Sequence, residues 1–370
     1  MTVLRRLVCA ALGGLILVSA VGPVSDAGEF AIRRGVNISH WLSQSGRRGE
    51  ERRAWFTEQD VAFLARCGYD HIRLPIDEEQ MFDTQGNKEE EAFRLLHAGI
   101  GWALKHDLRV IVDLHILRSH HFNAAEKPLF TDPKEQERFC RLWEKLSGEL
   151  NRYPVDKVAY ELMNEPVADD PDDWNRIVAK AVAAIRKLEP TRVIVIGSNR
   201  WQSASTFDQL KIPEGDRNII LSFHFYEPFL VTHYRASWTG NKDYTGPIHY
   251  PGRLIRPEEI EALPPDQQRF AKAHNGEYNL DVLTKMIAKP LAVAKKTGLP
   301  LYCGEFGCIE ACPRDVRLAW YRDVRTMFET HGIAWANWDY KGGFGIADSA
   351  DEPDVELIRI LTGVDLSQAN

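Results

Sequence analysis

The sequence predicts an α/β fold, a (β/α)8 TIM barrel that forms a single domain. Eight short β-forming runs alternate with longer amphipathic stretches over about 300 residues, the length and count typical of such barrels. An open, doubly wound sheet is the alternative, but it would usually carry a glycine-rich phosphate loop after an early strand, and none is present. The predicted strands are 32–38, 71–74, 109–115, 158–164, 193–197, 219–226, 301–306 and 334–338.

Helices are predicted between these strands from their capping residues. Asp132-Pro133 and Asp170-Pro171 place an N-cap residue before a proline in the first helical position, and Thr57 precedes acidic first-turn residues. The predicted helices are 58–67, 89–106, 134–151, 172–188, 203–210, 281–297 and 315–330. Residues 227–276 break the alternation, and we expect a long functional loop insertion after strand six.

The first 27 residues are a predicted secretory signal peptide. Arg5 and Arg6 precede an apolar run over residues 7–21, and a Ser-Asp-Ala sequence ends at Ala27. We predict cleavage after Ala27; cleavage after Ala20 and an uncleaved anchor are the alternatives. The run is short for a membrane span. The barrel is then expected to occupy residues 28–370. Once the signal is cleaved, we expect a secreted or periplasmic protein that is no longer attached to the membrane.

The composition excludes several classes of protein. With 44% hydrophobic and 27% charged residues, the chain can bury a large core, which excludes a disordered protein. A formal charge of −7 disfavours a nucleic-acid partner. Five cysteines follow the signal, and an odd number leaves at least one free thiol in an exported protein. A Cys308–Cys312 bridge or buried free thiols are both preferred to a zinc site, because no fourth ligand lies nearby.

Polar residues gather at the carboxyl ends of the predicted strands, where barrel enzymes carry their catalytic groups. Every strand except the first and fifth supplies an ionisable or hydrogen-bonding side chain there. These residues are Arg73, His115, Asn164, Glu165, His224, Tyr226, Glu305 and Trp338.

This set resembles glycoside hydrolase family 5, the cellulase family of retaining barrel glycosidases. Asn-Glu-Pro after strand four and Gly-Glu-Phe-Gly after strand seven carry the resemblance, which covers nearly the whole predicted barrel. It implies that Glu305 is the nucleophile and Glu165 the acid/base of a double displacement. The alternative for each glutamate is a salt bridge at the barrel rim.

The resemblance also assigns supporting roles to the other residues. Arg73 and Tyr226 are expected to contact Glu305, with Arg73 keeping it ionised, and His224 to tune the charge of Glu165. The expected sugar-binding residues are Asn164, His115 and Trp338, with Trp41, Trp201 and Trp238 as further aromatic platforms. Each role has a structural alternative. Arg73 could form an ion pair inside the barrel, and His115 and His224 could be buried structural histidines. The three tryptophan platforms could instead pack in the core.

The implied function is hydrolysis of a β-linked polysaccharide or oligosaccharide, first of all as an endo-β-1,4-glucanase. The stretch from Tyr226 to Trp238 is similar to one in bacterial endoglucanases of the family. A β-mannanase, an exo-β-1,3-glucanase and a non-catalytic carbohydrate-binding barrel are the alternatives. We expect a monomer with no cofactor and no metal. A metal-dependent hydrolase, using Asp113, His115, His120, His121 and His224, would lack a completed ligand set on the other strands.

Overall fold

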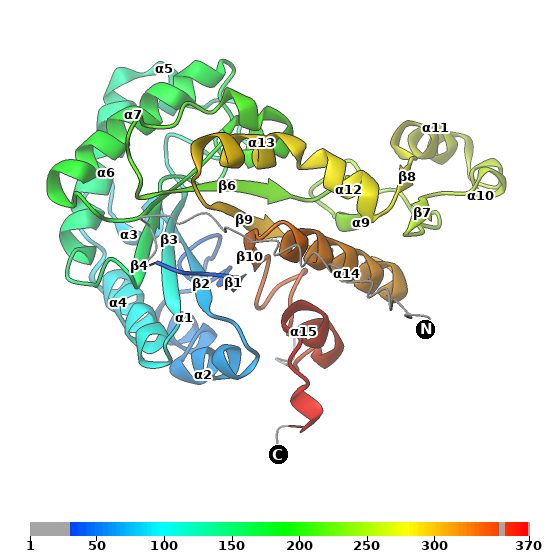
Figure 1. Cartoon of the computed structure of the whole chain (residues 1–370), viewed down its shortest axis with the longest axis horizontal. Helices are drawn as coiled ribbons and strands as arrows, with labels where there is room; N and C mark the ends of the chain where they lie inside the picture. The colour runs from blue at the N-terminus through cyan, green and yellow to red at the C-terminus, as the bar shows by residue number, and fades with distance from the viewer. Residues whose placement is uncertain (1–29, 348–351, 369–370) are drawn as a thin grey trace, which may run out of the picture.

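The computed structural model describes residues 30–347 and 352–368. The predicted signal peptide therefore lies outside the described residues. The chain forms a closed barrel of eight parallel strands in the order β1-β10-β9-β6-β5-β4-β3-β2 (Figure 1). The predicted barrel is confirmed, and the alternative of an open, doubly wound sheet is wrong. The barrel strands are β1(Arg34–Asn37), β2(His71–Asp77), β3(Arg109–Ile116), β4(Val158–Glu161), β5(Ile194–Gly197), β6(Ile219–Phe225), β9(Leu301–Phe306) and β10(Ala334–Asn337).

The helices surround this barrel, and the three whose caps were predicted start at those caps. Asp132 and Asp170 accept hydrogen bonds from Lys134 N and Asp172 N, and Thr57 forms a capping box with Asp60. The helices that flank the strands are α1(Gly49–Trp55), α2(Glu58–Arg66), α3(Glu78–Met81), α4(Glu90–Lys105), α5(Pro128–Thr131), α6(Pro133–Leu150), α7(Pro171–Leu188), α8(Asn199–Gln202), η1(Ala204–Gln209), α12(Leu280–Met286), α13(Ala288–Thr297), α14(Arg314–Thr330), α15(Val355–Thr362) and η2(Leu366–Gln368).

The predicted helix 281–297 is two helices, α12 and α13, separated at Ile287. Pro290 explains the break, because it has no N–H and its ring would clash with the carbonyl of Met286 in a continuous helix. In the observed arrangement Pro290 falls in the first turn of α13, where a backbone N–H has no helical partner to lose. Six of the short elements around the barrel were not predicted: α1, α3, α5, α8, α15 and η2.

The interior of the barrel has an apolar lower layer and a polar upper layer. Ile111, Ala159 and Ile220 belong to a buried apolar cluster inside the barrel. Two residues further along the same strands, and hence on the same face, come Asp113, Glu161 and Ser222. All three are buried, so the polar layer lies at the carboxyl ends of the strands, directly beneath any site at that rim.

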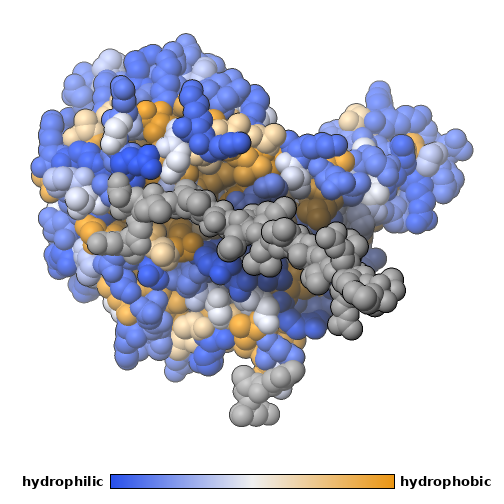
Figure 2. Space-filling model, viewed as in Figure 1, coloured by the Kyte–Doolittle hydropathy of each residue, from blue (hydrophilic) through white to orange (hydrophobic). Residues whose placement is uncertain are grey.

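The segment between β6 and α12, predicted as a loop over 227–276, contains regular elements. They are α9(Phe229–Thr232), β7(Gly252–Arg253), α10(Pro257–Glu261), α11(Pro265–His274) and β8(Glu277–Tyr278). Figure 1 shows α10, α11 and the β7–β8 pair extending away from the barrel, and Figure 2 shows that this projecting part is mostly hydrophilic. Pro257 and Pro265 each stand in the first turn of a short helix, which explains part of the proline content.

Two further sequence expectations can be compared with the described residues. The five cysteines in residues 30–347 are all free, so the predicted alternative of buried thiols holds for Cys308 and Cys312 and the bridge between them is absent. Within 30–347 and 352–368, no helix combines the length and apolar character that crossing a bilayer requires.

Candidate active site

A cleft of about 910 Å³ lies over the carboxyl ends of the barrel strands. Both predicted catalytic glutamates line it, as do most of the predicted sugar-binding residues. The predicted site residues in its wall are His115, Asn164, Glu165, Trp201, His224, Tyr226, Trp238, Glu305 and Trp338. Arg73 lies buried beneath this cleft, and Trp41 lies outside it.

Glu305 lies within strand β9, so the barrel ladder fixes its backbone. Its Oε1 is 2.7 Å from Arg73 Nη1, and its Oε2 accepts a hydrogen bond of 3.0 Å from the Tyr226 hydroxyl. Burial raises the pKa of the Glu305 carboxyl, and the Arg73 guanidinium is the strongest influence that lowers this pKa again. The two contacts thus favour the ionised form of a carboxyl that burial alone would keep protonated.

Arg73 is the centre of a buried charge network at the bottom of the cleft. Its Nε lies 2.7 Å from Glu161 Oε2, and its Nη2 lies 3.1 Å from Asp113 Oδ2. With Glu305, three carboxyl groups surround one guanidinium, which cannot neutralise three full charges. Burial raises the pKa of Asp113 to about 7, so Asp113 holds a proton at acidic pH.

The network includes residues that the sequence analysis did not assign to the site. The expectation that the first and fifth strands supply no ionisable or hydrogen-bonding group is wrong. Asn37 of β1 accepts a bond from Arg73 Nη1 (2.9 Å), and Gln202 after β5 donates to Glu161 Oε1 (2.8 Å). Glu161 itself could have been found, because a charged residue inside an otherwise apolar strand needs a buried partner.

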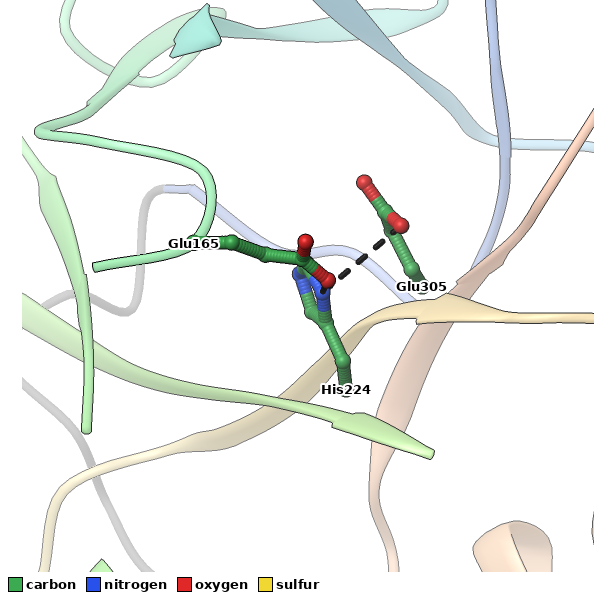
Figure 3. A group of neighbouring side chains, drawn as sticks. All are labelled: Glu165, His224 and Glu305. Carbon is green, nitrogen blue, oxygen red and sulfur yellow. Dashed lines mark hydrogen bonds and ion pairs between the residues drawn. The ribbon is translucent and has the colours of Figure 1, made fainter. Parts of the chain in front are cut away.

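Glu165 lies beyond the end of β4, in an irregular segment. His224 Nδ1 is 3.0 Å from Glu165 Oε1 and 3.6 Å from Glu305 Oε2. Figure 3 shows the imidazole, from β6, beside the Glu165 carboxyl and on the side that faces Glu305. Burial and the charge of Glu305 raise the pKa of Glu165 well above its ordinary value. Burial also lowers the pKa of His224 well below its usual range, so we assign a neutral ring with its proton on Nδ1.

The separation of the two glutamates defines what chemistry the site can perform. One oxygen of Glu165, one oxygen of Glu305 and a ring nitrogen of His224 all lie within 4.8 Å of one another. Retaining glycosidases hold their carboxyl groups about 5 Å apart, whereas inverting enzymes need about 6.5–9.5 Å to admit a water molecule. This spacing fits direct attack by one carboxylate.

The same three side chains are also the one group in the described residues that places three ligand atoms close enough to hold a metal ion. Arg73 argues against that use, because its guanidinium already pairs with Glu305 and would repel a cation held there. Of the other histidines considered for a metal site in the sequence, two have partners outside this group of three: His115 Nδ1 lies 2.6 Å from Asp113 Oδ2, and His120 Nε2 lies 2.8 Å from the Glu165 carbonyl oxygen.

His115 and Trp338 form one wall of the cleft. Their rings are nearly parallel, with an interplanar angle of 10° and centroids 5.5 Å apart. Burial lowers the pKa of His115 to about 4, so the ring is neutral, and Gln44 Nε2 lies 2.8 Å from its Nε2. Gln44, after β1, is a further cleft residue that the sequence analysis missed.

Two of the three predicted aromatic platforms face the cleft, and one does not. Trp201 and Trp238 are 44% and 59% exposed and line the cleft, so each presents a free ring face or edge. Trp41 as a sugar platform is wrong, because it is fully buried in the core. It packs against Phe56 and Trp102, and its indole N–H donates to Arg52 O.

Comparison with known proteins agrees with this geometry. The family model described as cellulase (glycosyl hydrolase family 5) matches residues 33–343. Endoglucanase C from Acetivibrio thermocellus is 31% identical over 340 residues, which cover 90% of this chain and 98% of that protein. Cellodextrinase A from Ruminococcus flavefaciens is 29% identical over 307 residues, or 82% of this chain and 84% of that protein. The structure of endoglucanase Cel5A from Thermotoga maritima shares the fold, with a TM-score of 0.73 at 24% identity over 91% of this chain and all of that one.

Proposed function

This chain belongs to the cellulase family, glycosyl hydrolase family 5, and is therefore a glycosidase; from that premise we propose that it is a retaining endo-β-1,4-glucanase. Glu305 acts as the nucleophile and Glu165 as the general acid and then the general base. The observation that carries this proposal is the short distance between their carboxyl oxygens, which lie within 4.8 Å.

In the first step, Glu305 attacks the anomeric carbon while Glu165 donates its proton to the glycosidic oxygen. The bond to the leaving group breaks, and a glycosyl ester forms on Glu305. In the second step, Glu165 removes a proton from water, the water oxygen attacks the same carbon, and Glu305 leaves as a carboxylate. Arg73 and Tyr226 disperse the charge on Glu305 when it is free, since both contact its oxygens.

Electrostatics supports this division of roles. The pKa of Glu165 is raised by burial and by the charge of Glu305, so Glu165 holds the proton that the first step needs. When Glu305 becomes a neutral ester, that influence disappears and the pKa of Glu165 falls. Glu165 is then suited to accept a proton from water in the second step.

The stereochemistry of the product tests the double displacement. Proton NMR of fresh product, recorded before mutarotation, is expected to give the same anomeric configuration as the bond cleaved. An inverted first product would mean that water attacks the substrate directly, and would overturn the role given to Glu305.

The substrate class rests on the endoglucanases among the relatives and on the aromatic residues of the cleft. Flat rings such as Trp201 and Trp238 suit the apolar faces of β-linked glucose units. A product profile on carboxymethylcellulose, mixed-linkage glucan, mannan and β-1,3-glucan tests this. We expect a rapid fall in viscosity and mixed cello-oligosaccharides. Activity confined to mannan would favour a β-mannanase, and activity confined to β-1,3-glucan would favour an exo-β-1,3-glucanase. Binding without hydrolysis would favour the non-catalytic carbohydrate-binding barrel.

The proposed cellular form is an exported monomer without cofactor, made of residues 28–370 after removal of residues 1–27. Amino-terminal sequencing of the exported protein is expected to begin at Gly28, and size-exclusion chromatography to give a monomer. Retention in the cytoplasm at full length would contradict the export proposal.

A further inference from the structure

The segment that carries Glu165 lies beyond the end of β4, where Asn164 N still donates to Leu114 O of β3. Its backbone is held further at three consecutive carbonyl groups. Gln202 Nε2 donates to Asn164 O at 2.5 Å, and His120 Nε2 donates to Glu165 O at 2.8 Å. The backbone N–H of Trp201 donates to Pro166 O at 3.2 Å. Residues from the loops after β3 and β5 thus fix the backbone on both sides of Glu165.

The donors are themselves held firmly in place. Gln202 donates a second time to Glu161 Oε1, and residues 200–202 all have positive φ, between 52° and 60°. Gly197 permits this turn, because a Cβ there would lie 2.1 Å from Gln202 Oε1. His120 closes a tight turn with Leu117 and packs its ring against Phe130. Burial lowers the pKa of His120 to about 4, so the ring is neutral, and the bond to Glu165 O requires its proton on Nε2.

Neither side chain belongs to the reacting groups. His120 and Gln202 are buried and do not line the cleft, so they have no direct access to a sugar. The His120 ring donates to the backbone carbonyl of Glu165 itself. Gln202 donates to the carbonyl of the preceding residue, Asn164, in addition to its bond with the Glu161 carboxylate. A loop residue that must reach the glycosidic oxygen needs such support, because a displacement of about 1 Å can reduce a rate about 100-fold.

We infer that His120 and Gln202 are positioning residues for the general acid/base Glu165, and that they hold it through its backbone and not through its carboxyl. The inference rests on the proposed role of Glu165. The exposed Trp201 lies in the same turn as Gln202, so the aromatic wall of the cleft and the support of Glu165 form one unit.

The test compares substrates that differ in their need for a proton. We would measure kcat/KM, which reports the first step, with cellotetraose and with 2,4-dinitrophenyl β-cellobioside, whose leaving group departs without protonation. The variants are Gln202→Met and His120→Phe, which remove the donors at similar size. Asn175→Leu is the matched control, because Asn175 is buried in α7 and donates to a backbone carbonyl, Gln209 O, away from the cleft.

We expect Gln202→Met and His120→Phe to lower kcat/KM for cellotetraose about 10- to 100-fold and for the dinitrophenyl substrate less than about threefold. The basic limb of the pH profile should move to lower pH, because a loosened Glu165 is less buried and its pKa falls. The milder His120→Gln, which keeps an N–H donor, should show a smaller difference between substrates. Asn175→Leu should show none.

Equal losses on both substrates with an unmoved basic limb would overturn the inference and make both residues supports of the fold. Thermal unfolding identifies a variant that fails to fold, and His120→Gln then provides the comparison. Glu165→Gln separates the inference from the proposed function. If Glu165→Gln loses equal activity on both substrates, the proposed role of Glu165 is wrong. If Glu165→Gln loses more activity on cellotetraose but Gln202→Met and His120→Phe do not, only the inference about the positioning residues is wrong.

Discussion

Glu305 and Glu165 lie within a few ångströms of each other, but the chain positions them in opposite ways. Glu305 is part of β9, which pairs with β6 and β10, so the barrel ladder sets its place. Glu165 follows β4 by four residues and depends on Gln202, His120 and the N–H of Trp201 from neighbouring loops. The barrel ladder therefore holds the proposed nucleophile directly, whereas neighbouring loops supply these three contacts around the proposed acid/base.

Charge follows the same division. Glu305 has a cation in direct contact, and Arg73 is fixed in turn by Glu161 and Asp113. Among the described residues, the hydrogen-bond partner of the Glu165 carboxyl is the neutral imidazole of His224, and the Glu305 carboxylate lies nearby. The pKa of Glu165 therefore rises further than that of Glu305. The turn that supports Glu165 is unfavourable for its own backbone. Residues with a side chain, such as Trp201, pay about 1–2 kcal/mol each for a left-handed conformation.

Replacing each glutamate gives the largest expected effect and tests the contrast directly. Glu305→Gln should lower hydrolysis roughly 10⁴-fold or more on every substrate, because no other group can form the covalent ester. Glu165→Gln should lower kcat/KM for cellotetraose about 10²- to 10⁴-fold, the usual contribution of an acid, but far less for a dinitrophenyl glycoside. Steady-state kinetics on both substrates measures this, and identical patterns for the two variants would contradict the separate roles.

Arg73 sharpens the comparison through the pH profile, which should be bell-shaped with an optimum between about pH 5 and 7. Because Arg73 lowers the pKa of Glu305, Arg73→Gln should raise that pKa and move the acidic limb to higher pH, with a rate loss of about 100-fold. Arg73→Lys keeps the charge and should leave the limb nearer its original pH. If the acidic limb does not move in a folded Arg73→Gln variant, Arg73 serves only as an ion pair that supports the barrel.

The aromatic residues show a related contrast, between a side chain buried in the core and one exposed at the cleft. Trp238 is exposed on the loop after β6, so Trp238→Ala should raise KM about tenfold and leave the thermal stability near that of the unchanged protein. Trp41 is buried, so Trp41→Ala should lower the free energy of unfolding by about 3–5 kcal/mol with KM unchanged at low temperature. A raised KM for Trp41→Ala would contradict its placement in the core.

Tyr226→Phe should have the smallest effect. It removes a hydrogen bond of 3.0 Å to Glu305 but no charge, so the acidic limb should move upward by less than about one pH unit, and less than in Arg73→Gln. The pH dependence of kcat/KM measures the shift. A downward shift would show that the phenol does not stabilise the ionised carboxyl.

The fold and the cleft residues followed from the sequence where local patterns are sufficient. Strand ends and capping residues located the barrel, Glu305 and Glu165, because the carboxyl ends of parallel strands share one rim. The support of Glu165 did not follow, because Gln202 and His120 act through backbone carbonyls distant in sequence, and no periodicity reveals such pairs. Trp41 was misassigned because its place after a strand is compatible with either the cleft or the core, and only packing decides.

Covalent trapping tests the central claim most directly. A 2-deoxy-2-fluoro cellobiosyl substrate with an activated leaving group should form a stable ester, because the fluorine slows its hydrolysis, and peptide mass spectrometry should find the label on Glu305. The Glu165→Gln variant should still be labelled, since this leaving group needs no proton. A label on Glu165, or no label with turnover intact, would contradict the assignment of Glu305 as the nucleophile fixed by the barrel.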